Sequence, residues 1–173
     1  IYFLIVKKRN DCDYLGLFKD CLSFIKIKLI KSNMLFPKKV KYRKWQTQRS
    51  NKNKVHNASR GVEVSFGSHG LKAMTPARIK SNQIEAARRV ISRTLGKSGK
   101  TWIRIFPDRP YTAKAAEVGM GKGKGDPQGY VVEVLPGRIL FEVDGVSGDI
   151  AKEALRKAGA KLPIKSKTVE RQG

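Results

Sequence analysis

Four glycines at alternate positions, with lysines between the last three, form the part of this sequence with the most distinctive chemistry. The stretch reads Gly119, Met120, Gly121, Lys122, Gly123, Lys124 and Gly125. Glycine adopts backbone angles that other residues avoid, and it lets another molecule approach the backbone closely. The long polar side chains between these glycines are cationic. The pattern therefore predicts a glycine-shaped loop that is either solvated or lies against a polyanion.

The spacing of these residues does not match a loop that binds the phosphates of a nucleotide cofactor. A Walker loop needs Ser or Thr directly after its Gly-Lys pair, because the hydroxyl binds magnesium. Gly123 and Gly125 stand at that position after the two Gly-Lys pairs. A dinucleotide fingerprint that starts at Gly119 would need glycine where Lys124 stands, and no helix is expected to follow. Small phosphates are therefore poor candidates for the target of this loop.

No group of residues in the sequence predicts catalysis or metal binding. His56 and His69 have no obvious carboxylate or cysteine partner, and the two cysteines fit no zinc spacing. Glu142 and Asp144 are expected to be surface and strand-end groups rather than an acid–base pair. We therefore predict that the protein is not an enzyme and that it uses no cofactor or metal.

The charge balance indicates a polyanionic partner. The 173 residues include 37 Lys and Arg but only 14 Asp and Glu, which gives a net charge of +23. Such a domain repels itself, and nucleic acid is the commonest counter-charge. An acidic membrane surface is the alternative, although no apolar run approaches the roughly 18 residues of a membrane-spanning helix.

Residues 1–33 differ in composition from the rest of the chain and are interpreted as an atypical N-terminal extension. The sequence does not begin with Met, and its composition changes sharply after Met34. Our hypothesis is that Met34 is the natural start and that residues 1–33 are upstream translated sequence. A genuine extension of the organelle type is the alternative.

Residues 34–60 are interpreted as a basic arm. They include nine cations and no acid, with Tyr42 and Trp45 among them. The cations are Lys38, Lys39, Lys41, Arg43, Lys44, Arg49, Lys52, Lys54 and Arg60. Since the segment has neither helical nor strand periodicity, we expect an extended arm rather than a folded element. It is either a solvated tail or an RNA-binding arm whose aromatic rings stack on bases.

Residues 61–165 have the patterns of a folded domain. Alternation over residues 62–66 predicts a strand. Ser81 or Asn82 is expected to cap the start of a helix, and Asn82 and Glu85 have capping-box spacing. Its apolar stripe is Ile84, Ala87, Ile91 and Leu95, and the residues that fall off this stripe include Arg88, Arg89 and Arg93. We expect this arginine face to contact anions.

The second half of the domain predicts three more strands and a second helix. Residues 101–106 predict a strand with Trp102 as core anchor, and residues 130–135 and 139–143 predict a hairpin around Pro136-Gly137. The second helix is expected to start near Asp149 and to bury Ile150, Ala154, Leu155 and Ala158. Residues 166–173 predict a loose polar tail. The expected fold is α+β, a two-layer sandwich of an antiparallel or mixed sheet with two packed helices and a basic N-terminal arm.

A series of short motifs runs across residues 34–167. They are Met34–Lys39 with Lys41–Lys44, Phe66-Gly67 with Gly70–Ala73, Gln83–Arg89, Trp102–Asp108, Met120–Gly125 and Lys161–Lys165. In content and order they resemble the bacterial-type large-subunit ribosomal protein L sixteen family, also called the universal L sixteen and eukaryotic L ten family. Residues 1–33 lie outside this resemblance.

The resemblance implies a structural constituent of the large ribosomal subunit, which binds large-subunit rRNA near the peptidyl transferase centre and helps to position aminoacyl-site tRNA. It implies neighbouring large-subunit ribosomal proteins as further partners, with no membrane and no small-molecule substrate. The implied location is the ribosome, in a bacterial cytoplasm or an organellar matrix or stroma. An extra-ribosomal nucleic-acid-binding or RNA-chaperone module is the alternative.

The resemblance also implies which residues contact RNA. The rRNA-binding residues would be Lys38, Lys39, Lys41, Tyr42, Arg43, Lys44, Arg49, Arg60, Arg88, Arg89 and Arg93. The loop Gly119–Gly125 would approach the peptidyl transferase centre and tRNA. The chain departs from the family at Gly119, where many bacterial members have Arg. Without that arginine, the loop lacks a forked, permanently charged hydrogen-bond donor.

Overall fold

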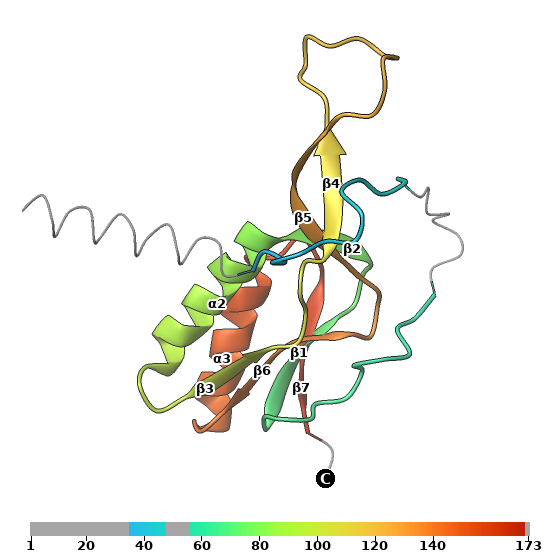
Figure 1. Ribbon diagram of the computed structural model, residues 1–173. Coiled ribbons are helices and arrows are strands. Elements are labelled where there is room, and N and C mark those ends of the chain that lie inside the picture. The colour runs from blue at the N-terminus through green and yellow to red at the C-terminus, as the bar shows by residue number, and fades with distance from the viewer. Residues whose placement is uncertain (1–34, 48–55, 172–173) are drawn as a thin grey trace, which may run out of the picture. The chain divides into compact units, whose positions relative to one another are not determined.

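The computed structural model describes residues 35–47 and 56–171 (Figure 1). The expectations for residues 1–33 and for Arg49, Lys52 and Lys54 lie outside the described residues. Residues 35–47 and 56–68 contain neither a helix nor a strand, and the folded elements begin at His69.

The described residues form two antiparallel sheets and two helices. The strands are β1 His69–Ala73, β2 Ala77–Lys80, β3 Lys100–Ile103, β4 Arg109–Ala113, β5 Asp126–Val134, β6 Ile139–Asp144 and β7 Ser166–Glu170, and the helices are α2 Ser81–Leu95 and α3 Gly148–Gly159. One sheet has the order β3-β6-β1-β7 and the other has the order β2-β5-β4, with antiparallel pairing throughout. The predicted α+β fold class is confirmed.

The helices lie side by side and pack against the four-stranded sheet (Figure 1). The predicted stripe of α2 is confirmed, because Ile84, Ala87, Ile91 and Leu95 are all buried. In α3 the buried residues are Ala151, Ala154, Leu155 and Ala158. The expectation that Ile150 is buried was wrong, since its side chain is 44% exposed. Ala151, not Ile150, has the spacing of three, four and seven that places residues on one helix face.

The N-cap of α2 lies one residue before the first of the two predicted caps, Ser81 and Asn82. The N-cap is Lys80, whose backbone N–H donates to Oε1 of Gln83 at 2.9 Å. Ser81 is buried in the first turn instead of capping it. Glu85 is likewise not part of a capping box, because its carboxylate accepts hydrogen bonds from Arg88 and Arg89.

The strand predicted over residues 62–66 is absent, and a buried carboxylate explains why. Oε2 of Glu142 accepts the backbone N–H groups of Ser65, Phe66 and Gly67 at 3.2, 2.6 and 3.0 Å. These donors are therefore satisfied by a side chain rather than by a neighbouring strand. Glu142 is fully buried, so the expectation that it is a surface group was also wrong.

The Pro136-Gly137 turn is present, but it does not make the predicted hairpin. Gly137 has φ 94°, and the N–H of Arg138 donates to the carbonyl of Leu135 at 3.4 Å. The strands on either side belong to different sheets, since β5 pairs with β2 and β4 whereas β6 pairs with β1 and β3. An unprimed turn of this kind splays the strands on either side of it, whereas type I′ and II′ turns match the twist of paired strands in two-residue hairpins. The turn therefore carries the chain from one sheet to the other.

Three further sequence expectations need correction. β3 ends at Ile103, and Trp102 is only partly buried; Phe141 of β6 is the largest fully buried side chain. β4 was not predicted, because Pro110 was interpreted as a chain break. The tail expected to be loose forms β7 over residues 166–170 and pairs with β1 along its length. Its polar side chains fit an edge strand, since one side of such a strand faces solvent.

Candidate nucleic-acid interface

The glycine–lysine loop lies at the end of the β4–β5 hairpin. The two strands pair as far as Ala113 and Asp126, and residues 114–125 connect them. Figure 1 shows this loop at the far end of the hairpin, away from both helices. The loop is exposed apart from Gly125, and the Met120 side chain is fully exposed. A Cβ at Gly125 would lie 2.5 Å from the Ala113 carbonyl oxygen, so the loop closes only with glycine there.

Lys114 holds the shape of this loop from the inside. Its ammonium donates to the carbonyls of Gly119, at 3.4 Å, and Gly121. Gly121 and Gly123 have φ values of 94° and 87°, and Lys122 between them has φ 53°. Only a few per cent of non-glycine residues adopt such angles. Lys114 was not predicted from the sequence, because its role depends on a backbone shape that residue types do not specify.

Two lysines join the arm to the hairpin. The ammonium of Lys44 donates to the carbonyl of Lys124 at 3.1 Å and lies 3.6 Å from the Asp126 carboxylate. In return, the ammonium of Lys124 donates to the carbonyl of Trp45. The structure thus brings part of the predicted arm beside the predicted loop, although 79 and 80 residues separate the bonded pairs.

A buried arginine fixes the arm at the base of the hairpin. Arg109 is 7% exposed, donates to the carbonyl of Gln46 at 2.8 Å and lies 5.7 Å from the centre of the Trp45 ring. Arg109 also forms an ion pair with Glu133, which accepts a second hydrogen bond from Arg78 at 2.8 Å. Burial raises the pKa of Glu133, but the bonds from the two arginines outweigh it and lower the pKa overall. Arg109 was not predicted as a site residue, because residues 107–110 were interpreted only as the end of a strand.

The arginine face of α2 is partly neutralised by its own acid. Arg88 donates two hydrogen bonds to Glu85, at 2.7 and 2.8 Å, and Arg89 donates one at 3.2 Å. The hydrogen bond from Arg88 is the largest cause of the lowered pKa of Glu85. Arg93 is exposed and has no side-chain partner among the described residues. Arg93 is therefore the most available of the three cations.

The other predicted RNA-contact residues lie on the surface. Lys38, Lys39, Lys41, Tyr42, Arg43 and Arg60 are all exposed. Within the described ranges, no hydrogen bond or ion pair joins the arm to Arg88, Arg89 or Arg93. The described residues thus contain one joined cationic surface, made by arm and hairpin, and a separate arginine face on α2.

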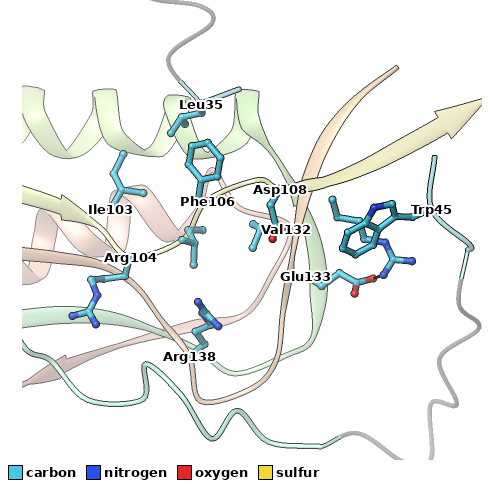
Figure 2. A pocket seen from close by; sticks show the side chains of 11 residues that line it. Leu35, Trp45, Ile103, Arg104, Phe106, Asp108, Val132, Glu133 and Arg138 are labelled. Atoms are coloured by element: carbon cyan, nitrogen blue, oxygen red, sulfur yellow. Dashed lines mark ion pairs between the residues drawn. The ribbon is translucent and has the colours of Figure 1, made fainter. Parts of the chain in front are cut away.

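A groove of about 550 Å³ adjoins the arm–hairpin contact, since Trp45 and Arg109 also line it (Figure 2). Its lining includes the apolar side chains Leu35, Ile103 and Phe106 and three arginines, Arg104, Arg109 and Arg138. In the part of the chain that the structure describes, no cluster of metal-ligating side chains occurs, and no helix is long and apolar enough to cross a membrane.

Comparison with known proteins shows the family to which the chain is related. The family model described as "Ribosomal protein L16p/L10e" matches residues 37–169. This chain belongs to that family. The match covers both helices, most of the arm and the whole glycine–lysine loop. The resemblance inferred from the short motifs is therefore confirmed.

Members of the L16p/L10e family from several bacteria align with nearly their whole length. "Large ribosomal subunit protein uL16" of Sphingopyxis alaskensis is 55% identical over 141 residues, which cover 81% of this chain and 95% of that protein. The proteins of the same description from Zymomonas mobilis and Afipia carboxidovorans are also 55% identical, and cover 81% and 80% of this chain and 95% and 98% of their own length.

Proposed function

We propose that this chain is a structural constituent of the large ribosomal subunit that binds large-subunit rRNA near the peptidyl transferase centre and helps to position aminoacyl-site tRNA. The family membership supports the ribosomal part of this proposal. The observation that carries the RNA-binding part is the pair of lysine bonds that joins the arm to the hairpin. These bonds turn two cationic segments into one surface.

The joined surface has the chemistry of an RNA-binding site. Tyr42 and Trp45 are 56% and 42% exposed among the arm cations, so their rings are accessible to bases. Aromatic rings stack on unpaired bases, while Lys and Arg contact phosphates without regard to sequence. Both parts are needed for a protein that binds a folded RNA with unpaired segments.

The loop residues Gly119–Gly125 are proposed to reach toward tRNA and the peptidyl transferase centre. The loop projects at the end of the hairpin and presents mainly backbone, Met120 and Lys122 to a partner. A backbone with little side-chain bulk allows close approach to another molecule. The peptide-bond chemistry itself is left to the RNA.

Co-sedimentation tests the proposed function directly. The full chain is expected to remain with large subunits after a wash at about 0.5 M salt, because many phosphate contacts and aromatic stacking act together. Release at that salt, with binding to unrelated RNA of equal strength, would instead identify an extra-ribosomal RNA-binding module. Flotation with anionic liposomes but not with ribosomes would support the membrane-surface alternative.

A prediction for α2 follows from its ion pairs. The Arg89→Ala/Arg93→Ala double variant is expected to reduce occupancy in purified large subunits. It should also lower the slope of log affinity against log salt by about 0.7–0.9 for each lost phosphate contact. Arg88→Ala is the matched comparison, with a smaller effect expected because Glu85 already engages the Arg88 guanidinium. Quantitative mass spectrometry of subunits gives occupancy, and equal loss in both variants would contradict the assignment.

A further inference from the structure

The groove beside the arm contains an arginine that the fold leaves without a side-chain partner. Nε of Arg138 is buried and has no hydrogen-bond partner, and no ion pair to Arg138 occurs among the described residues. The other two arginines of the groove differ, because Arg104 pairs with Glu142 and Arg109 pairs with Glu133. Arg138 is thus a positive charge in the groove lining that no described acidic side chain neutralises.

The backbone holds Arg138 in a fixed place. Its N–H donates to the carbonyl of Leu135 at 3.4 Å, and its carbonyl accepts the N–H of Ala73 at 2.8 Å. Figure 2 shows its guanidinium pointing into the groove, toward the chain segment that carries Phe106. A preorganised guanidinium loses little freedom when it binds, and its planar fork matches the oxygens of a phosphate.

The wall near Arg138 is apolar and partly exposed. Phe106 is 46% exposed, and Leu35 and Ile103 are partly buried along the same groove. The volume of about 550 Å³ lies within the roughly 300–1,000 Å³ typical of sites for small organic groups. A free inorganic anion would use Arg138 but leave this wall in water. The ligand should therefore combine an anion with a flat, largely apolar ring.

We propose that this groove binds one unpaired nucleotide of an RNA, with its phosphate on Arg138 and its base against Phe106. This inference rests on the proposed function, and its two central residues, Arg138 and Phe106, lie outside the arm and the loop. Bases splayed out of an RNA are commonly stacked on aromatic side chains. Glu133 is already neutralised by two arginines, and the exposed Asp108 can accept a hydrogen bond from a base amino group.

An acidic peptide of a neighbouring protein is the competing occupant. Peptide carboxylates would also pair with Arg138, but an acidic peptide offers no flat ring to Phe106. Its further carboxylates would face Asp108, which also lines the groove. A single nucleotide places one anion at Arg138 and a neutral base beside the apolar wall, so it fits the distribution of charge better.

Photochemical cross-linking of assembled large subunits tests the site. Subunits that contain the full chain are irradiated at about 254 nm, and nucleotide–peptide adducts are identified by mass spectrometry. We expect an adduct at Phe106 and a separate adduct at Tyr42 of the arm. Arg138→Gln should lower the yield at Phe106 about tenfold, the scale of one lost charge-assisted hydrogen bond, and leave the yield at Tyr42 unchanged. Arg156→Gln, an exposed arginine of α3, is the matched control.

The outcomes separate this inference from the proposed function. A Tyr42 adduct without a Phe106 adduct overturns the nucleotide site while the proposed function stands. A protein cross-link at Phe106 in place of a nucleotide identifies the peptide alternative and also overturns it. Failure of the chain to co-sediment with large subunits overturns both proposals. The unsubstituted chain alone decides between these results even if Arg138→Gln does not assemble.

Discussion

Replacing Glu142 by Gln is expected to lower the free energy of unfolding by about 3 kcal/mol, since breaking a buried charge pair leaves its partner uncompensated. In the parent chain, one carboxylate oxygen of Glu142 accepts hydrogen bonds from three backbone N–H groups, and the other accepts a hydrogen bond from Arg104. The amide of Gln has only one oxygen. Its NH2 group must therefore face either the three N–H donors or the guanidinium, and donors then meet donors.

Chemical unfolding followed by circular dichroism measures this effect. Glu153→Gln is the control, because Glu153 is an exposed acid of α3 whose ion pair with Lys157 lies on the surface, and its change should be within experimental error. In a double-mutant cycle, Glu142→Gln and Arg104→Gln should couple by about 1–2 kcal/mol. A loss below about 1 kcal/mol for Glu142→Gln would show that residues 65–67 do not depend on this carboxylate.

The same carboxylate predicts a dependence on pH. Burial raises the pKa of Glu142, but hydrogen bonds from Phe66, Gly67 and Ser65 and the charge of Arg104 lower it below the ordinary value of 4.5. A lowered folded-state pKa contributes stability that is fully present above pH 4.5 and is lost as the pH falls through the folded value. The difference in the free energy of unfolding between the parent chain and Glu142→Gln should therefore become smaller at acid pH. An equal difference at neutral and acid pH would contradict this assignment.

The helices could be predicted because their signals are local. The stripe of α2 repeats at spacings of three and four, and that period alone identifies the side that packs on a sheet. The error at Ile150 was small, since Ala154, Leu155 and Ala158 were correctly predicted to be buried and only the first residue of that face was misassigned. Residue size favoured Ile150, but the spacing of Ala154, Leu155 and Ala158 favoured Ala151.

The arrangement of the strands could not be predicted, because it depends on partners distant in sequence. Nothing near residues 65–67 in the sequence indicates that a carboxylate 75–77 residues away accepts hydrogen bonds from their N–H groups. Similarly, the Pro136-Gly137 turn was identified correctly, but a turn does not specify whether its flanking strands pair. The polar β7 became a strand only because β1 has an open edge.

The candidate site was predicted in composition but not in organisation. Charge counting identified the arm cations and the loop lysines as one class. The structure divides that class, because some ammonium groups bind backbone carbonyls of the protein itself. Such bonds have no sequence signature, since any carbonyl accepts equally well. Lys114, whose ammonium donates to the carbonyls of Gly119 and Gly121, was missed for this reason.

The second large effect is expected from substitutions of the three lysines in residues 114–125. The structure gives these lysines different contacts and therefore different roles. Lys114 binds the carbonyls of Gly119 and Gly121, and Lys124 binds the carbonyl of Trp45. Lys122 is exposed and has no side-chain partner among the described residues. On the proposed function, Lys122 is the cation that meets RNA, whereas Lys114 and Lys124 hold the loop and the arm in place.

Lys122→Met is therefore expected to weaken aminoacyl-site tRNA binding to assembled ribosomes about tenfold, the scale of one charge-assisted contact. It should lower the salt slope by roughly 0.7–0.9, as loss of one phosphate contact does. Lys161→Met, at an exposed position beyond α3, is the charge-matched control and should change neither quantity.

Lys114→Met should weaken tRNA binding by a different route, because it frees the loop without removing the contact at Lys122. Its salt slope should stay near that of the parent, while amide hydrogen exchange across residues 119–125 of the isolated chain becomes faster. Lys122→Met should leave that exchange unchanged. Lys124→Met should instead speed exchange in residues 44–46, which lose their bond to the hairpin. If all three variants lost the same salt slope and kept the same exchange, the lysines would act as one undivided charge patch, and the separation of their roles would be wrong.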